Sequence, residues 1–179
     1  MICNPSDVIE SLTLPALPLQ FDLERPFTAT EIAGGPDAIA SARKATVAVF
    51  MRRLKAFLSE VQDDQGCELM PGKNCQLCQS LYDIKFSAHV VVYLPEFTWQ
   101  RTLMVAYTLN AQLVCLPDSE SDRKLLVYTK ANEEVSLVDL SIYNPGRCFR
   151  MLYNCKLMSP SPLKPTLGSS SRIARHDGP

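Results

Sequence analysis

Residues 19–25 alternate between apolar and polar side chains, which is the two-residue period of a strand with one buried face. On such a strand Asp22 and Glu24 point to one side, and Phe21 and Leu23 point to the other. Two adjacent carboxylates repel each other unless a cation lies between them, and a divalent metal ion is a common solution. The segment therefore predicts a strand with a candidate metal-binding pair, although a solvated strand face gives the same pattern.

Residues 85–94 form a second predicted strand. Its apolar face consists of Phe86, Ala88, Val90, Val92 and Leu94. The other face carries Lys85, Ser87 and His89, followed by Val91 and Tyr93. An ammonium group, a hydroxyl and an imidazole in a row offer the donors that suit a polyphosphate, and a polar surface strand is the alternative.

Apolar residues at three- and four-residue steps predict a long helix over residues 37–61, and a second helix is predicted over 97–116. The basic residues between the apolar positions of the first helix include Arg43, Arg52 and Arg53. We expect them to lie on its solvated face.

The remaining segments are shorter or irregular. Residues 26–36 and 62–80 are predicted as loops from their glycines, prolines and polar side chains. Residues 125–129 and 135–143 are predicted to pair as a β-hairpin. After residue 160 the chain is rich in serine and proline and then polar, so we expect no fixed structure there.

Asp139 interrupts the otherwise apolar run of the predicted strand 135–143. A buried aspartate is costly unless it is paired, hydrogen-bonded or bound to a metal. We therefore expect either a functional carboxylate here or an aspartate with a structural hydrogen bond.

Together these elements predict an α+β fold, in which a mixed or antiparallel sheet is flanked by helices. A chain of 179 residues, 46% of them hydrophobic, is long enough for one domain with a substantial core. We expect that domain to span residues 1–158 and a flexible tail to span 159–179.

Composition narrows the possible partners. The 18 basic and 19 acidic residues nearly balance, which excludes strong non-specific binding to nucleic acid by bulk charge. No apolar run approaches the ~20 residues that span a bilayer, so no membrane partner is expected. The cysteines are odd in number, seven, and we recognise no secretory signal, so we expect reduced thiols in an intracellular protein.

Cys75 and Cys78 have the spacing of half a zinc site. A structural zinc ion needs four ligands, and the nearby Cys67 does not complete the set. His89 already belongs to the polar face of a predicted strand. We therefore expect free thiols in a loop and no zinc in this chain.

Arg147 and Arg150 follow the last predicted strand, and Lys156 lies beyond them. Guanidinium groups bind phosphate through two parallel hydrogen bonds, so these residues are candidates to hold a nucleotide tail or a template backbone. Exposed basic residues in a turn are the alternative.

Three segments, taken in order, resemble the motifs of the archaeo-eukaryotic primase superfamily, and most closely its eukaryotic primase-polymerase (PrimPol) group. They are Phe21-Asp22-Leu23-Glu24, Lys85-Phe86-Ser87-Ala88-His89, and Val138-Asp139-Leu140-Ser141-Ile142-Tyr143 with its extension Arg147-Cys148-Phe149-Arg150. The resemblance spans about residues 19–157 and implies an archaeo-eukaryotic primase-like catalytic core.

This resemblance implies a DNA-directed primase/polymerase, a nucleotidyltransferase that adds dNTPs or NTPs to a nucleic-acid strand. Asp22, Glu24 and Asp139 would hold two Mg²⁺ or Mn²⁺ ions. The incoming triphosphate would contact Ser87 and His89, helped by Lys85, Arg147, Arg150 and Lys156. The partners would be a dNTP or NTP and a single-stranded DNA template with its primer.

The resemblance further implies a part in replication restart or DNA damage tolerance, in the nucleus or the mitochondrion. We recognise neither the family's amino-terminal template-binding part nor its zinc module, which supports priming, in this sequence, and we expect both to be absent from the chain. We therefore expect extension of a primer more readily than priming. Truncation of the chain relative to the family would weaken the enzyme's activity. Two other functions stay open: a non-catalytic member that binds nucleotide or nucleic acid, and a metal-dependent nuclease, since two-metal sites also cleave phosphodiesters.

Overall fold

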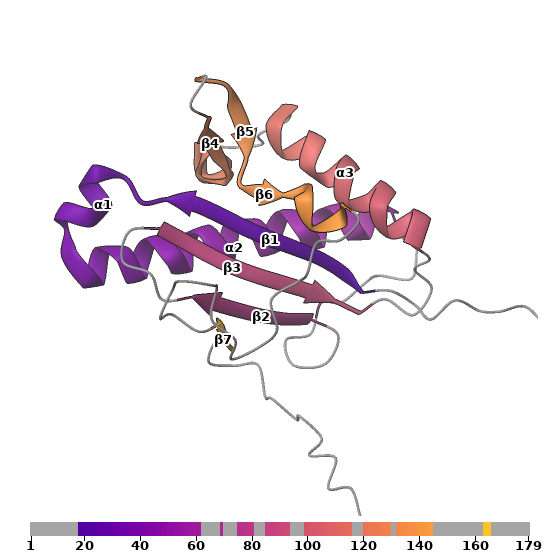
Figure 1. Cartoon of the computed structure of the whole chain (residues 1–179), viewed down its shortest axis with the longest axis horizontal. Helices are drawn as coiled ribbons and strands as arrows, with labels where there is room; N and C mark the ends of the chain where they lie inside the picture. The colour runs from indigo at the N-terminus through magenta and orange to yellow at the C-terminus, as the bar shows by residue number, and fades with distance from the viewer. Residues whose placement is uncertain are drawn as a thin grey trace, which may run out of the picture.

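The fold is that of a computed structural model, which describes residues 18–61, 69, 75–80, 85–93, 99–115, 120–129, 132–144 and 163–165. Figure 1 shows the elements, which in chain order are β1 (Leu19–Pro26), α1 (Ala29–Ala33), α2 (Gly35–Val61), β2 (Cys75–Ser80), β3 (Lys85–Val92), α3 (Trp99–Cys115), the 3₁₀ helix η1 (Glu120–Leu125), β4 (Leu126–Tyr128), β5 (Glu134–Ser136), β6 (Val138–Asp139), the 3₁₀ helix η2 (Leu140–Tyr143) and β7 (Leu163–Pro165).

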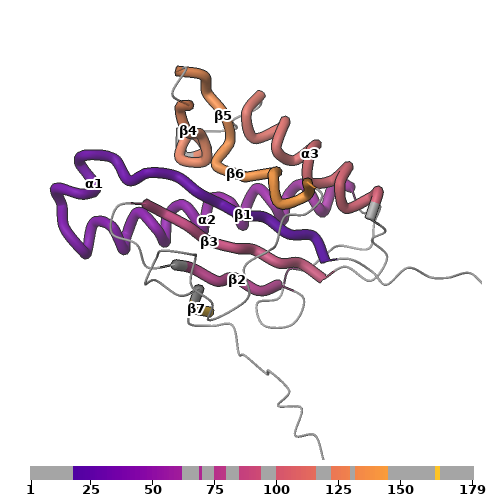
Figure 2. The backbone as a smooth tube through the Cα atoms, viewed as in Figure 1, coloured from indigo at the N-terminus to yellow at the C-terminus, as the bar shows by residue number. Residues whose placement is uncertain are grey.

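Five strands form one antiparallel sheet in the order β6-β1-β3-β2-β7, and β4 pairs with β5 in a separate hairpin. β1 and β3 pair over the whole of β1, from Leu19 opposite Val92 to Pro26 opposite Lys85. β6 lies beside β1 although the two are far apart in the sequence (Figure 2). The predicted α+β class is confirmed, with the antiparallel form of the sheet.

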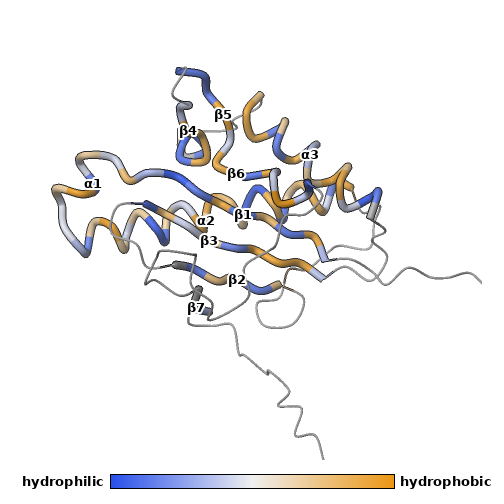
Figure 3. The backbone as a smooth tube through the Cα atoms, in the orientation of Figure 1, coloured by the Kyte–Doolittle hydropathy of each residue, from blue (hydrophilic) through white to orange (hydrophobic). Residues whose placement is uncertain are grey.

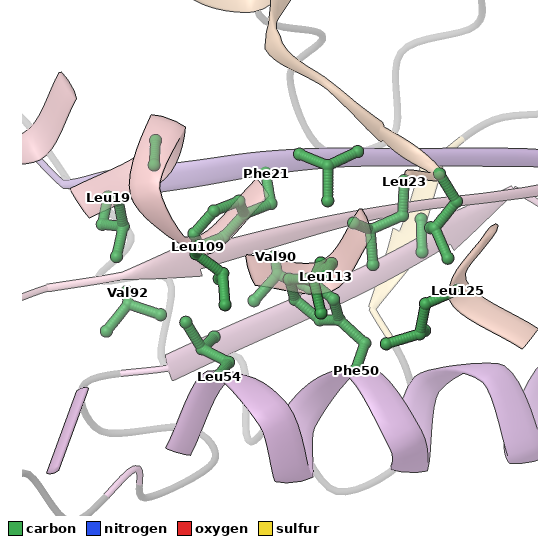
Figure 4. Packing of buried hydrophobic residues seen from close by; sticks show 14 of the residues in the cluster. Leu19, Phe21, Leu23, Phe50, Leu54, Val90, Val92, Leu109, Leu113 and Leu125 are labelled. Carbon is green, nitrogen blue, oxygen red and sulfur yellow. The ribbon is translucent and has the colours of Figure 1, made fainter. Parts of the chain in front are cut away.

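One face of this sheet is buried under the long helices. α2 runs behind the sheet in Figure 1, and its Phe50 packs edge-on against Phe21 of β1, with ring centroids 5.3 Å apart. Leu54 of α2 and Leu109 of α3 join the same cluster (Figure 4). Burying a leucine or phenylalanine stabilises a fold by about 1.5–3 kcal/mol, so this face forms the core.

The opposite face of β1 and β3 receives the polar side chains. Figure 3 shows hydrophilic and hydrophobic residues along both strands. Successive side chains of a strand point to opposite sides, so the hydrophilic side chains can lie on the face away from the core. The strands predicted over 19–25 and 85–94 are therefore confirmed, although β3 ends at Val92. The helices predicted over 37–61 and 97–116 are confirmed as α2 and α3.

The loop predicted over residues 26–36 is wrong, because this segment contains α1 and the start of α2. Thr28 caps α1 reciprocally with Glu31: the Thr28 hydroxyl accepts from the Glu31 N–H, and the Glu31 carboxylate accepts from the Thr28 N–H. Gly35, with φ of +75°, then makes the left-handed turn between the two helices, a conformation that glycine adopts without strain.

Two further segments carry strands that the sequence pattern did not predict. Residues 75–80 belong to the predicted irregular stretch and form β2 instead. Residues 163–165 lie in the predicted tail and pair with β2 as β7, so the expectation of no fixed structure after residue 160 is wrong for them. Both strands are short and are defined by their pairing with a neighbouring strand. Their sequences therefore show no sustained alternation of apolar and polar residues.

The hairpin predicted for 125–129 and 135–143 is confirmed only in its first part, as β4 and β5. The chain then leaves β5, pairs with β1 over the two residues of β6 and turns into η2. Asp139 causes the turn, because its Oδ1 accepts a hydrogen bond from the Ser141 N–H at 2.8 Å and so caps η2.

The basic residues of α2 do not all lie on a solvated face. Arg52 is more than half exposed, as predicted, but Arg43 and Arg53 are buried. The Arg43 guanidinium lies 5.4 Å from the centroid of the Phe27 ring, and Arg53 Nη1 lies 3.7 Å from Asp122 Oδ2. Partners on distant elements therefore draw these arginines inward.

Among the described elements, no helix combines the length and the apolar character needed to cross a membrane.

Candidate active site

The pairing of β6 and β3 with β1 places residues of the three predicted motifs side by side in one sheet. Asp22 of β1 lies opposite Asp139 of β6 on one side and opposite His89 of β3 on the other. Directly opposite residues of an antiparallel pair share a face of the sheet. One cross-strand row therefore contains Asp139, Asp22 and His89.

A second row runs beside the first. Glu24 lies opposite Ser87, and Lys85 comes two residues before Ser87 on the same side of β3. Six of the nine predicted site residues thus share one side of the sheet, which we call the polar face: Asp22, Glu24, Lys85, Ser87, His89 and Asp139.

On the polar face the carboxylates of β1 contact the lysine and histidine side chains of β3. His89 Nε2 lies 3.3 Å from Asp22 Oδ1, and Lys85 Nζ donates to Glu24 Oε2 at 2.9 Å. His89 is 5% exposed and Asp22 18%, whereas Lys85 and Glu24 are each about one third exposed. The inner end of the site is therefore shielded from water, and the outer end is open to it.

Ser87 lies between Lys85 and His89 along β3 and is almost fully buried, at 1% exposure. Among the residues that the structure describes, its hydroxyl has no hydrogen-bond partner. A buried hydroxyl without a partner is costly, so its presence here needs a reason other than packing.

The environment of the Asp139 side chain differs from the predicted one. The sequence pattern implied a buried carboxylate, and the structure places an exposed one at the end of the short strand β6. The residue forms the structural hydrogen bond that was the alternative, as the cap of η2. Its position opposite Asp22 nevertheless puts it beside the other two carboxylates.

The donor set suits a hard divalent cation in its chemistry, because Mg²⁺ and Mn²⁺ prefer carboxylate oxygens. In the described part of the chain, however, no group of three or more His, Cys, Asp or Glu side chains is arranged to hold a metal ion. Asp22 and Glu24 contact His89 and Lys85 instead. Binding two ions here would require these contacts to open.

The two cysteines with zinc-like spacing lie in β2, and not in a loop as predicted. Cys75 lies opposite Val92, and Cys78 lies opposite His89. Because they are three residues apart on a strand, their thiols point to opposite faces and cannot share one ion. Burial raises the pKa of the Cys78 thiol, which favours its protonated form.

The remaining predicted site residues lie outside the described residues. These are the basic residues that follow the third motif, Arg147, Arg150 and Lys156, together with Cys67.

Two residues lie near the site in positions that the sequence pattern did not predict, Cys78 and Tyr143. Cys78 extends the row of Asp139, Asp22 and His89 onto β2, and only the unpredicted strand places it there. Tyr143 contacts the backbone of β1 beside Asp22, through hydrogen bonds to Gln20. Its place at the end of the third motif was visible in the sequence, but a partner so distant along the chain was not.

No protein-family model matches the chain, and no curated protein matches it in sequence.

Proposed function

We propose that this chain is a metal-dependent nucleotidyltransferase of the archaeo-eukaryotic primase kind, which adds nucleotides to a primed DNA strand. The observation that carries the proposal is the register of β6, β1 and β3. It gathers three carboxylates, a lysine, a serine and a histidine, taken from three separate segments, on one face of one sheet.

The polar face would divide its work between two sets of residues. Asp22, Glu24 and Asp139 would hold Mg²⁺ or Mn²⁺, which supplies activation of the attacking hydroxyl and neutralisation of the leaving pyrophosphate. Lys85, Ser87 and His89 would donate to the triphosphate.

On this proposal Lys85 and His89 would each bind either a carboxylate of β1 or the triphosphate. In the structure each contacts a carboxylate of β1. A bound divalent ion would replace them as the partner of Asp22 and Glu24, and a triphosphate would then offer Lys85 and His89 new acceptors. Ser87 is buried between them, where its hydroxyl would gain the partner that the described residues do not supply.

Primer extension tests this function. The wild-type protein is incubated with a labelled primer on a single-stranded DNA template, dNTPs or NTPs, and Mn²⁺ or Mg²⁺. We expect extension by the wild type, and we expect the Asp22→Asn/Glu24→Gln variant to extend primers at least about 100-fold more slowly. Even residues that only hydrogen-bond to metal ligands contribute about 10–100-fold to metal affinity or activity.

Glu133→Gln is the matched control, because Glu133 is an exposed carboxylate in the β4–β5 turn, away from the polar face. It should extend primers as the wild type does. Equal extension by the wild type and the Asp22→Asn/Glu24→Gln variant would contradict the proposed function.

A second candidate is a non-catalytic domain that binds nucleotide. The contacts of Asp22 with His89 and of Glu24 with Lys85 favour it, because they give both carboxylates a partner without metal. Triphosphate binding that needs no divalent ion, together with no extension, would support this candidate over the first.

A further inference from the structure

β1 loses its strand neighbour near the site. β6 pairs only with Leu23 and Asp22, and the chain then turns away from the sheet into η2 (Figure 1). Alternate residues of an antiparallel strand direct their N–H and C=O groups to the same side. The groups of Gln20, two residues before Asp22, therefore face the edge at which β6 has ended, and such half-buried groups need partners.

Tyr143 supplies both partners with a single hydroxyl. It donates to the Gln20 carbonyl oxygen at 2.5 Å and accepts from the Gln20 N–H at 3.1 Å. Burial raises the pKa of Tyr143 to about 12, so the hydroxyl keeps the proton that it donates. The side chain thus takes the place of a strand residue at this position of β1.

The segment from Leu137 to Tyr143 is consequently attached to β1 at three successive positions. The Glu24 N–H donates to the Leu137 carbonyl oxygen at 2.9 Å, Asp22 pairs with Asp139, and Gln20 is held by Tyr143. Asp139 is the middle attachment, on a strand of only two residues. Its position relative to Asp22 therefore depends on the attachments on either side.

We propose that Tyr143 is a positioning residue, which keeps the Asp139 carboxylate opposite Asp22 by holding η2 against β1. It acts through the backbone of Gln20 and through η2, whose first turn Asp139 caps. The effect on metal binding rests on the proposed function, whereas the effect on the position of Asp139 does not.

The positional effect is tested by amide hydrogen exchange in Tyr143→Phe. This variant removes only the hydroxyl, and we expect exchange at the Glu24 and Ser141 amides to become about 10-fold faster, the effect of losing roughly one hydrogen bond. Tyr128→Phe is the matched control, because Tyr128 is exposed in β4 and donates to Glu134 there. Unchanged exchange at both amides in Tyr143→Phe would overturn the proposal.

The consequence for the site is tested by titrating the same proteins with Mn²⁺ and following free Mn²⁺ by electron paramagnetic resonance. We expect Tyr143→Phe to bind about 10-fold more weakly than the wild type and Tyr128→Phe to bind equally. Faster exchange with unchanged Mn²⁺ affinity would overturn the positioning role and leave a purely structural hydrogen bond. A wild-type protein that binds no Mn²⁺ would count against the proposed function, and the exchange rates would still show whether Tyr143 holds the segment.

Discussion

At the scale of single residues, the polar face contains buried polar side chains, Ser87 and His89. Ser87 is the clearest case, because its hydroxyl is buried and unpartnered among the described residues. A hydroxyl in this state lowers stability, and burial of its methylene group alone would serve the core equally well. The function proposed above would give this hydroxyl a ligand as its partner.

Ser87→Ala separates these two roles. We expect the free energy of unfolding to stay equal or to rise by up to about 1 kcal/mol, because the buried hydroxyl no longer has to be desolvated. Triphosphate affinity should fall roughly 10-fold, the loss of one hydrogen bond to a charged group. Urea unfolding and nucleotide titration measure the two quantities.

The control for this variant is Ser59→Ala on α2, where the hydroxyl is exposed and donates to the Lys55 carbonyl oxygen. It should leave nucleotide affinity unchanged. A Ser87→Ala protein that loses stability and keeps its affinity would show that the hydroxyl is structural.

At the scale of elements, a polar cluster joins the end of β1 to α1 and α2. The Arg25 guanidinium donates to both carboxylate oxygens of Glu31, at 2.9 and 3.0 Å, and also to the Thr46 hydroxyl. Its carbon lies 5.5 Å from the centroid of the Phe27 ring. Glu31 therefore links the capped start of α1 to a buried arginine of the sheet.

This cluster predicts an acid-sensitive step in stability. The hydrogen bond from Arg25 is the largest of the effects that lower the pKa of Glu31, from its usual 4.5 to about 2. A carboxyl whose pKa is lower in the folded state contributes stability above pH 4.5, and this contribution is lost as the pH falls towards 2. Glu31→Gln should cost about 1.5–3 kcal/mol at pH 7 and much less at pH 2.

Urea unfolding at several pH values measures this difference, with the exposed Glu133→Gln as the control. Unfolding curves for the wild type and Glu31→Gln that stay equally far apart from pH 7 to pH 2 would contradict the role of the Glu31 charge.

At the scale of the whole molecule, periodicity predicts which side chains share a face, but not which strands are neighbours. The two-residue period placed Asp22 with Glu24, and Ser87 with His89, and the long helices followed from their own period. The order β6-β1-β3-β2-β7 depends on pairings between distant segments. The meeting of Asp139 with Asp22 could therefore be expected only from the resemblance.

The remaining differences between the predicted and the observed structure have local physical causes. β2 and β7 are short and are defined by their partners, so the segments of Cys78 and Lys164 carry no strand pattern of their own. Arg43 and Arg53 are buried beside Phe27 and Asp122, which come from other parts of the chain. Charge alone would have placed both arginines in solvent.

The most direct test of the account is primer extension by Asp139→Asn, because only the fold brings this residue to Asp22. Asparagine keeps a side-chain oxygen that can accept from the Ser141 N–H, so the cap of η2 and the fold should be preserved. With an unchanged unfolding temperature, we predict a loss of at least about 100-fold in the rate of metal-dependent extension. Full extension by a folded Asp139→Asn protein would contradict the claim that the polar face is a metal-dependent nucleotidyltransferase site.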